Sequence, residues 1–192
     1  MKLVLVDRNA ALVGAWGRAF AELADVEVKR GDYLGGEADA IVSPSNSFGY
    51  MSAGVDLAIR ALFGENLEVA VQSAIASEHR GELIVGQAMA VPTGDSRVAT
   101  LIVAPTMRVP GPVGDTLNAY LAFRAALLLS QELAGDADGF TLRCCGLGTG
   151  LGAMAPRRCA VQMRAAYRKV FEDSAIASPQ ETLALHRTLL GA

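Results

Sequence analysis

Gly146-Leu147-Gly148-Thr149-Gly150-Leu151-Gly152-Ala153-Met154 is a glycine-rich stretch between a strand-like run, 140–145, and a helix that is expected to begin near Ala155. The backbone N–H groups of such a loop can approach an anion closely, and the dipole of the following helix favours negative charge. The stretch therefore predicts a phosphate-binding loop. The alternative is a glycine-rich turn that only packs the helix tightly against the sheet.

A second stretch with similar logic lies about a hundred residues earlier. Asp39-Ala40-Ile41-Val42 is typical of a buried strand, and the loop Ser43-Pro44-Ser45-Asn46-Ser47-Phe48-Gly49 follows it. In an α/β domain, ligands bind beyond the carboxyl ends of the central strands. The two loops together predict one crevice for a phosphate-bearing small molecule.

The rest of the chain alternates strand and helix patterns, as in an α/β layered domain. Strands are expected at 2–6, 26–29, 39–42, 82–91, 100–104 and 139–145. Helices are expected at 10–23, 54–63, 65–78, 115–133 (capped by Asp115), 157–171 and 181–190. A turn is expected at 92–95, and Ser178 with Glu181 fits a capping box before the last helix.

The composition limits the classes of protein to consider. The 192 residues suffice for one domain with a buried core. Although 52% of the residues are hydrophobic, no apolar run approaches the ~20 residues of a membrane span. The apolar start of the chain is shorter than a signal peptide, so we expect a cytoplasmic protein. The net charge of −3 predicts no general attraction to nucleic acid or to an anionic membrane.

The three cysteines, Cys144, Cys145 and Cys159, form no CxxC pair and indicate neither a disulfide framework nor a zinc site. We expect them to be small buried residues. No cofactor or metal is predicted, since a phosphate loop of this kind requires none. Arg108 and Arg143 could reach the crevice, but surface positions are expected for both.

The glycine-rich stretch also fits a dinucleotide-binding pattern. Gly148, Gly150 and Ala153 satisfy G-x-G-x-x-A, the signature of a Rossmann loop. That signature normally belongs to the first strand–helix–strand unit of a chain, whereas this loop lies about forty residues before the end. No further strand clearly follows it. A Rossmann loop is therefore a third interpretation of this stretch, open but less favoured than a phosphate-binding loop of another kind.

Three polar residues are candidates for a site, and each has a local alternative. Asn46 could hydrogen-bond sugar hydroxyls or orient a water, or it could close an Asx-turn within its own loop. Asp56 lies at the start of a predicted helix, where a carboxylate also interacts favourably with the positive end of the helix dipole. Asp32 follows Gly31 and could simply form a turn.

Four segments together resemble the macrodomain family, whose members are ADP-ribose-binding modules. They are Gly31-Asp32, the run 39–47, Ala53-Gly54-Val55-Asp56-Leu57-Ala58-Ile59 and Gly148-Thr149-Gly150. The family motifs are a GD pair, "NAAN", "GGGVDxAI" and "STGxYG", and their order and approximate spacing are met over 25–172. The resemblance implies a three-layer α/β/α fold with a mixed sheet. Together with the length and the capping box, it predicts one macrodomain-like domain over 1–192 with a C-terminal helix in 178–192.

The resemblance also implies a role for each matching residue. Asp32 would accept a hydrogen bond from the adenine amino group, and Asn46 would contact the distal ribose. Backbone amides near the distal ribose and its phosphate would come from Ala53, Gly54 and Val55. The diphosphate would be wrapped by Gly148, Thr149, Gly150 and Leu151. Asp56 would be the carboxylate that some family hydrolases use as a base or to orient the attacking water.

Three departures distinguish this chain from the family pattern. Ser43-Pro44-Ser45-Asn46 replaces "NAAN", and Ser52-Ala53-Gly54 replaces the glycine triplet. The usual aromatic residue of the late loop is missing, and Met154 is expected to fill its place. This variant resembles a macro-like branch also found among phage tail-associated proteins.

Three functions remain open at this stage. The first is an enzyme that removes ADP-ribose from a protein, a nucleic acid end or a metabolite, with Asn46 and Asp56 positioning water. The second is a reader that binds ADP-ribose without chemistry. The third is a structural or interaction protein with a vestigial pocket.

Overall fold

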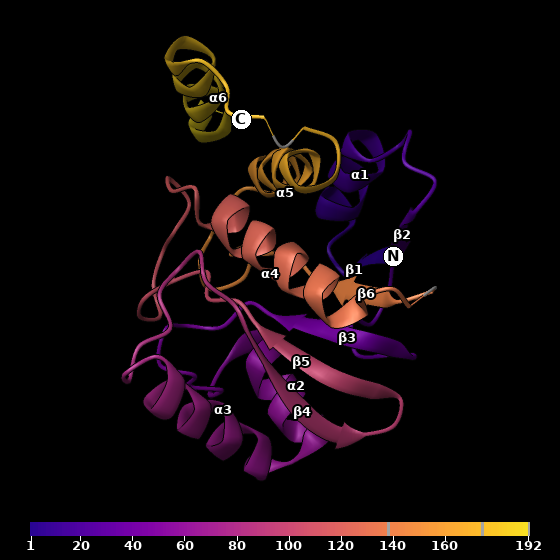
Figure 1. Ribbon diagram of the computed structural model, residues 1–192, viewed down its shortest axis with the longest axis vertical. Helices are drawn as coiled ribbons and strands as arrows, with labels where there is room; N and C mark the ends of the chain where they lie inside the picture. The colour runs from indigo at the N-terminus through magenta and orange to yellow at the C-terminus, as the bar shows by residue number, and fades with distance from the viewer. Residues whose placement is uncertain (138, 174, 192) are drawn as a thin grey trace.

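The computed structural model describes residues 1–137, 139–173 and 175–191. At its centre lies a six-stranded sheet in the order β2-β1-β6-β3-β5-β4 (Figure 1). The strands are β1 Lys2–Asp7, β2 Val26–Arg30, β3 Ala38–Ser43, β4 Met89–Asp95, β5 Val98–Val103 and β6 Thr141–Cys144. Neighbouring strands run parallel except β4, which is antiparallel to β5. The expected mixed sheet is therefore confirmed.

Helices cover both faces of this sheet, as Figure 1 shows. One layer holds α1 Ala10–Ala19, α4 Asn118–Ala134 and α5 Pro156–Phe171, and the other holds α2 Gly54–Phe63 and α3 Glu65–Glu78. Each layer has its own cluster of buried side chains against the sheet. The three-layer α/β/α fold is confirmed.

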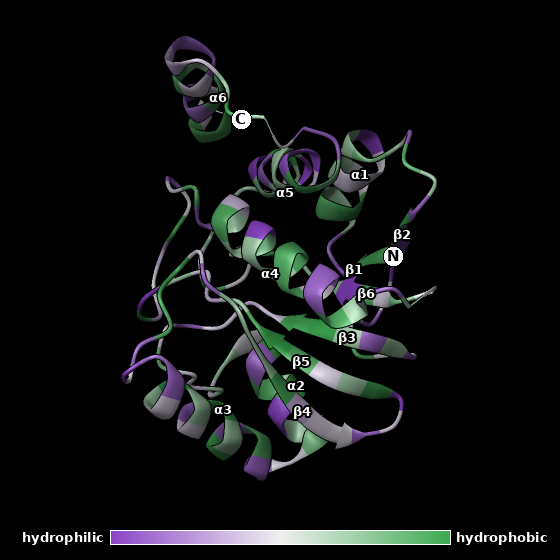
Figure 2. Ribbon diagram, viewed as in Figure 1, coloured by the Kyte–Doolittle hydropathy of each residue, from purple (hydrophilic) through white to green (hydrophobic). Residues whose placement is uncertain are grey.

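The central strands are hydrophobic along most of their length because both of their faces are covered (Figure 2). In β3, Ala40 and Val42 join the core under α1, α4 and α5, while Ile41 joins the core under α2 and α3. Helix α4 presents small side chains to its core, and Ala119 and Ala126 are fully buried. Their short side chains let α4 pack close to the strands.

The β4–β5 hairpin differs from the sequence prediction. We expected a strand over 82–91 and a turn over 92–95, but β4 spans Met89–Asp95. Pro92 is accommodated because β4 is the last strand of the sheet, where a missing N–H breaks no ladder on the open side. The pairing shifts register between Pro92 and Asp95, which carries the strand past the proline.

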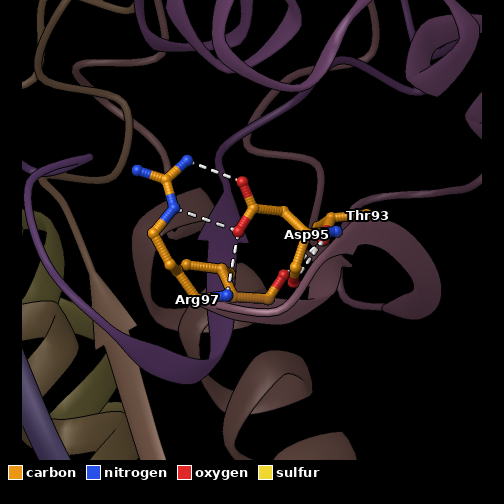
Figure 3. A network of polar contacts seen from close by, with 4 residues as sticks. Thr93, Asp95 and Arg97 are labelled. Atoms are coloured by element: carbon orange, nitrogen blue, oxygen red, sulfur yellow. Dashed lines mark hydrogen bonds and ion pairs between the residues drawn. The ribbon is translucent and has the colours of Figure 1, made fainter.

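Side chains close the hairpin turn, as Figure 3 shows. The Asp95 carboxylate accepts the backbone N–H of Arg97 at 2.8 Å and two guanidinium N–H groups at 3.1 and 2.6 Å. The Thr93 hydroxyl accepts the Asp95 N–H at 3.0 Å. This cluster lies at the amino end of β5, so it is at the edge opposite to the carboxyl ends of the parallel strands.

Two helix boundaries were predicted wrongly. Helix α1 ends at Ala19 rather than near residue 23, and α4 begins at Asn118. The Thr116 hydroxyl accepts the Asn118 N–H at 3.2 Å, whereas the expected cap, Asp115, forms an ion pair with Arg158 at 2.7 Å. None of the helices in the described residues is both long and apolar enough to cross a membrane.

Helix α6, Pro179–Gly191, begins at the expected capping box. The Ser178 N–H donates to the Glu181 carboxylate at 2.9 Å, and the Glu181 N–H donates to the Ser178 hydroxyl at 3.3 Å. The helix lies outside the three layers, against α5 (Figure 1). The Gln162 amide donates to the Leu189 carbonyl at 3.1 Å, and Leu189 is buried. Packing on α5 is therefore what this helix does in the fold.

Candidate functional site

A cavity of about 520 Å³ lies at the carboxyl ends of the parallel strands. It is bordered by the segments that follow β1, β2, β3 and β6, and by the start of α2. All ten residues that the sequence marked as site candidates lie on its wall, and they are Asp32, Asn46, Ala53, Gly54, Val55, Asp56, Gly148, Thr149, Gly150 and Leu151. The structure thus brings these residues together, and their roles toward a ligand stay predictions.

Asp7 ties two of the bordering segments together, and the sequence analysis missed it. It ends β1, which lies between β2 and β6 in the sheet. Its carboxylate accepts the N–H of Asn9 at 2.8 Å and the N–H of Gly146 at 3.2 Å. One side chain therefore fixes both the entry to α1 and the first amide of the glycine-rich loop. An acidic residue directly after an apolar strand was the available signal.

The glycine-rich loop presents bare backbone N–H groups at the cavity wall. Within the described part of the chain, the amides of Thr149, Gly150 and Leu151 donate no hydrogen bond to the protein. Gly150 has open space where a Cβ would be, since no heavy atom beyond its two chain neighbours lies within 4 Å of that position. Unpartnered amides beside open space are suited to an anion.

Other glycines of this loop serve packing. A Cβ on Gly152 would lie 2.5 Å from the Gly148 carbonyl oxygen and 2.7 Å from Val113. Gly148 itself has φ +71°, a conformation that favours glycine. The packing interpretation therefore describes Gly148 and Gly152, while phosphate binding by the amides of the loop stays a prediction. Met154 is buried in the core and lies off the cavity wall, so it does not fill the place of the missing aromatic residue.

The N-terminus of α2 supplies a second group of free amides. Its N-cap is Ala53, whose side chain makes no capping hydrogen bond. The first N–H groups of a helix have no partner within the helix, and the dipole makes this end positive. Ala53, Gly54 and Val55 all line the cavity, so these amides lie at its wall.

Asp56 lies in the first turn of α2, and its carboxylate accepts a hydrogen bond from the Ser43 hydroxyl at 2.6 Å. Burial raises the pKa of Asp56 to about 6, and the hydrogen bond from Ser43 opposes that rise. Ser43 ends β3 and stands at the first position of the variant "NAAN" motif. At neutral pH this carboxylate is mostly ionised and close to its pKa, as suits a general base.

The Asn46 side chain makes its hydrogen bonds within its own loop. Its amide nitrogen donates to the Tyr50 carbonyl at 2.8 Å, and its amide oxygen accepts the N–H groups of Phe48 and Tyr50 at 3.1 and 3.3 Å. The residue is buried, although it also borders the cavity. The Asx-turn interpretation therefore describes the side chain as it stands, with one amide N–H left over for another partner.

Asp32 also closes a local turn, because its carboxylate accepts the Leu34 N–H at 3.1 Å. A second partner, Arg8, donates to the same carboxylate at 2.9 Å. The Leu34 amide, and then Arg8, lower the pKa of Asp32 from its ordinary value. Arg8 follows β1 and lines the cavity, but nothing in its local sequence indicated a site.

The two other arginines differ from each other. The surface position predicted for Arg143 was wrong, because it is 9% exposed on β6 and donates to the carbonyls of Tyr33 and Gly35. These hydrogen bonds hold in place the loop that carries Asp32. Arg108 is exposed as expected, where it forms an ion pair with Glu82 at 2.7 Å.

The three cysteines are buried as free thiols, as expected. Burial raises the pKa of Cys159 to about 12 and the pKa values of Cys144 and Cys145 above their ordinary value. Cys145 borders the cavity, and its thiol stays neutral there. Among the described residues, no three His, Cys, Asp or Glu side chains are grouped so that they could hold a metal ion.

Comparison with known proteins identifies similar sequences. The family model described as Macro domain matches residues 42–163. An uncharacterized protein of Aquifex aeolicus (strain VF5) is 33% identical over 153 residues, which cover 79% of this chain and 86% of that protein.

Solved structures show the same fold. The macrodomain of Mycobacterium tuberculosis DarG is similar with a TM-score of 0.61 and 21% identity, covering 73% of this chain and 88% of that one. An Oceanobacillus iheyensis macrodomain mutant with ADPR is similar with a TM-score of 0.60 and 18% identity, covering 80% and 85%.

These findings also decide between the two interpretations of the glycine pattern. The match to the family model includes the loop at 148–153. In the described residues no strand follows β6, so this loop belongs to no further strand–helix–strand unit. A dinucleotide-binding Rossmann loop is therefore not supported, and the likeness to the phage tail-associated branch stays a prediction.

Proposed function

The chain belongs to the Macro domain family, and from this premise we propose that it binds ADP-ribose or a closely related nucleotide in the cavity beyond the parallel strands. The Oceanobacillus iheyensis macrodomain mutant that shares the fold carries ADPR. The cavity of about 520 Å³ is within the size range of small-molecule sites.

One observation carries this proposal, namely that two groups of free backbone amides border the same cavity. The amides of 149–151 come from the loop after β6, and those of 53–55 come from the start of α2. A diphosphate can accept hydrogen bonds from both groups, and the amides of 53–55 lie at the N-terminus of α2. The negative net charge of the chain makes such local contacts necessary for an anionic ligand.

The individual contacts follow from the resemblance to the family. In the proposal, Asp32 accepts from the base and Asn46 uses its remaining amide N–H toward the distal ribose. The amides of Ala53, Gly54 and Val55 contact the distal ribose and its phosphate. The diphosphate is held by Gly148, Thr149, Gly150 and Leu151.

We further propose that Asp56 acts as a general base in hydrolysis of an ADP-ribosyl ester. Its carboxylate would take a proton from a water molecule that attacks the anomeric carbon of the distal ribose. A bond forms between the water oxygen and that carbon, the bond from that carbon to the ester oxygen breaks, and the acid leaves as a carboxylate. The position of Asp56 on the wall and its pKa of about 6 support this role.

A reader without catalysis is the second candidate function, and the state of Asn46 favours it. Three hydrogen bonds within its own loop occupy most of the Asn46 amide. A residue held in this way contributes to the shape of the cavity more than to positioning of water. Catalysis needs closer positioning than binding does.

Calorimetric titration with ADP-ribose, with AMP and NAD as comparisons, tests the binding proposal. Gly150→Glu adds a carboxylate at the wall where a side chain has room, so we expect affinity to fall by about tenfold or more through like-charge repulsion. Ser96→Glu adds the same charge at the exposed hairpin turn on the opposite edge and is the matched control. Equal affinities of the two variants, or no binding by the wild type, would contradict the proposal.

Turnover of an ester-linked ADP-ribosylated peptide separates the enzyme from the reader. We expect Asp56→Asn to lower turnover by about a hundredfold or more, and to lower affinity for ADP-ribose far less. Binding by the wild type without turnover would instead establish the reader.

We also infer that residues 1–192 form one domain in the cytoplasm. Both core clusters pack on the same sheet, which supports a single folding unit in the described part of the chain. The free thiols are compatible with a reducing compartment. Limited proteolysis, with the product masses measured, tests the single unit, and fractionation of cells tests the location.

A further inference from the structure

Arg8 and Asp32 meet at one end of the cavity because the strands that carry them are neighbours. β1 and β2 pair in parallel with Asp7 opposite Arg30, so the residues that follow each strand emerge side by side. The Gly31 N–H donates to the Asp7 carbonyl at 3.1 Å and continues this pairing beyond the strands. The guanidinium and the carboxylate are then 2.9 Å apart, and both residues line the cavity.

This ion pair is not placed to stabilise the fold. The side chains of Arg8 and Asp32 are 79% and 57% exposed, and ion pairs so exposed contribute little to stability. The loop that carries Asp32 is already held by a buried arginine, Arg143, which donates to the Tyr33 and Gly35 carbonyls. The exposed pair is therefore free for another role.

Both partners line the cavity and retain hydrogen-bonding capacity. Arg8 donates to Asp32 through one terminal nitrogen of a guanidinium that has five N–H donors. One Asp32 oxygen accepts the Leu34 N–H and the other accepts from Arg8, and each oxygen has a further lone pair. A planar ligand edge that has both an acceptor and a donor matches such a pair.

We propose that Arg8 is a specificity-determining residue that lets the base subsite accept 6-oxopurines as well as adenine. This inference rests on the proposed function, because it concerns the base of a nucleoside diphosphate ribose. A 6-oxopurine presents O6 as an acceptor and N1–H as a donor, which match the guanidinium and the Asp32 carboxylate. Arginine pairs with the O6 and N7 acceptors of purines in the same way when it recognises guanine.

A carboxylate alone would favour adenine over 6-oxopurines. It accepts from the amino group of adenine but faces the lone pairs of O6 in hypoxanthine, and the unpaired oxygen would then be costly. Adenine still fits the pair, because its amino group donates to Asp32 while its N7 accepts from Arg8. The guanidinium therefore removes the discrimination that Asp32 by itself would impose.

Calorimetric titration of the full chain with ADP-ribose and with its hypoxanthine analogue, inosine diphosphate ribose, tests the inference. We expect the wild type to bind both ligands with affinities within about tenfold of each other. Arg8→Ala should weaken the hypoxanthine ligand by at least about tenfold more than ADP-ribose, because a charge-assisted hydrogen bond to O6 is lost. Arg8→Lys, which keeps a charged donor, should restore part of that difference.

Arg97→Ala is the matched control, since it removes an arginine from an exposed ion pair at the hairpin on the opposite edge. It should leave the ratio of the two affinities as in the wild type. If the wild type binds ADP-ribose and rejects the hypoxanthine ligand, or if Arg8→Ala leaves the ratio unchanged, the role of Arg8 is overturned while the proposed function stands. If the wild type binds neither ligand, the proposed function itself fails.

Discussion

The loop that follows β3 and the loop that follows β6 both line the cavity, but different interactions hold them in place. In the first, polar groups do so: Asn46 makes three hydrogen bonds, Glu68 accepts the Met51 N–H at 2.9 Å, and Thr106 donates to the Pro44 carbonyl at 2.8 Å. In the second, apart from the Asp7 carboxylate that accepts the Gly146 N–H, chain segments lie so close at several glycines that side chains would not fit; in the first, Gly49 alone is packed in this way.

The close approach in the second loop is visible at its glycines. The Met154 N–H donates to the Gly148 carbonyl at 2.9 Å, and the Val113 N–H donates to the Gly152 carbonyl at 2.7 Å. A Cβ on Gly146 would lie 2.5 Å from both Leu12 and Thr149. Here the absence of side chains is the structural requirement.

This difference explains why the first loop can carry side chains where the family pattern has glycines. Ser52 and Ala53 stand in place of glycines in the first loop, and both are exposed. Because hydrogen bonds from other residues order that loop, added side chains there cost little. Gly146, Gly148 and Gly152 of the second loop leave little room for a side chain, because that loop is ordered by close packing.

The largest expected effect is that of Gly152→Ala, which tests packing in the second loop. Its Cβ would meet the Gly148 carbonyl oxygen at 2.5 Å and Val113 at 2.7 Å. We expect a loss of about 2–3 kcal/mol in the free energy of unfolding, measured by chemical denaturation. Gly150→Ala, with open space around its Cβ, is the control and should change stability by less than about 1 kcal/mol. Similar losses in both variants would refute the distinction between the two glycines.

Asn46→Ala tests the first loop and should have a somewhat smaller effect. It removes three hydrogen bonds and leaves the Tyr50 carbonyl and two N–H groups without a partner. We expect a loss of about 1–3 kcal/mol in thermal or chemical denaturation. Asn46→Asp keeps the acceptor for the two N–H groups and should fall between alanine and the wild type. If it destabilises as much as alanine does, the acceptor role is wrong.

Asp56→Asn tests the junction between β3 and α2. Unlike the two previous substitutions, it is expected to stabilise the protein at neutral pH. Burial raises the pKa of Asp56 from 3.8 to about 6, so the folded protein binds this proton more tightly than the unfolded chain. The resulting stabilisation is fully present below about pH 4 and is lost as the pH rises through 6. At pH 7 the variant should therefore be more stable than the wild type by at most about 3 kcal/mol, and the gain should vanish near pH 4.

Thermal denaturation of both proteins from pH 4 to pH 8 measures this effect. Ser43→Ala removes the hydrogen bond that lowers the Asp56 pKa, so it should move the pH dependence to a higher pH. A difference between Asp56→Asn and the wild type that does not depend on pH would show that ionisation of Asp56 is not its cause.

Much of the fold could be predicted because its signals are local. The apolar run that became β3, the capping box of Ser178 and Glu181, and each of the motif segments lie within a few neighbouring residues. The hairpin was missed because Pro92 is normally a turn signal, and only its place on an edge strand makes it acceptable in β4. Local pattern does not state which strand lies at an edge.

The sequence by itself determined an α/β layered domain from its hydrophobic periodicity, and its resemblance to the macrodomain motifs indicated the family, the three-layer fold and the set of candidate residues, because these signals are written along the chain. Only the tertiary structure decided the surroundings of each candidate. In the fold, Arg143 is buried and donates to the loop of Asp32, and Arg8 pairs with Asp32. Asn46 hydrogen-bonds within its own loop, and Asp7 accepts the Gly146 N–H. Most of these contacts join segments that only the pairing of distant strands brings together, so periodicity and spacing could not reveal them.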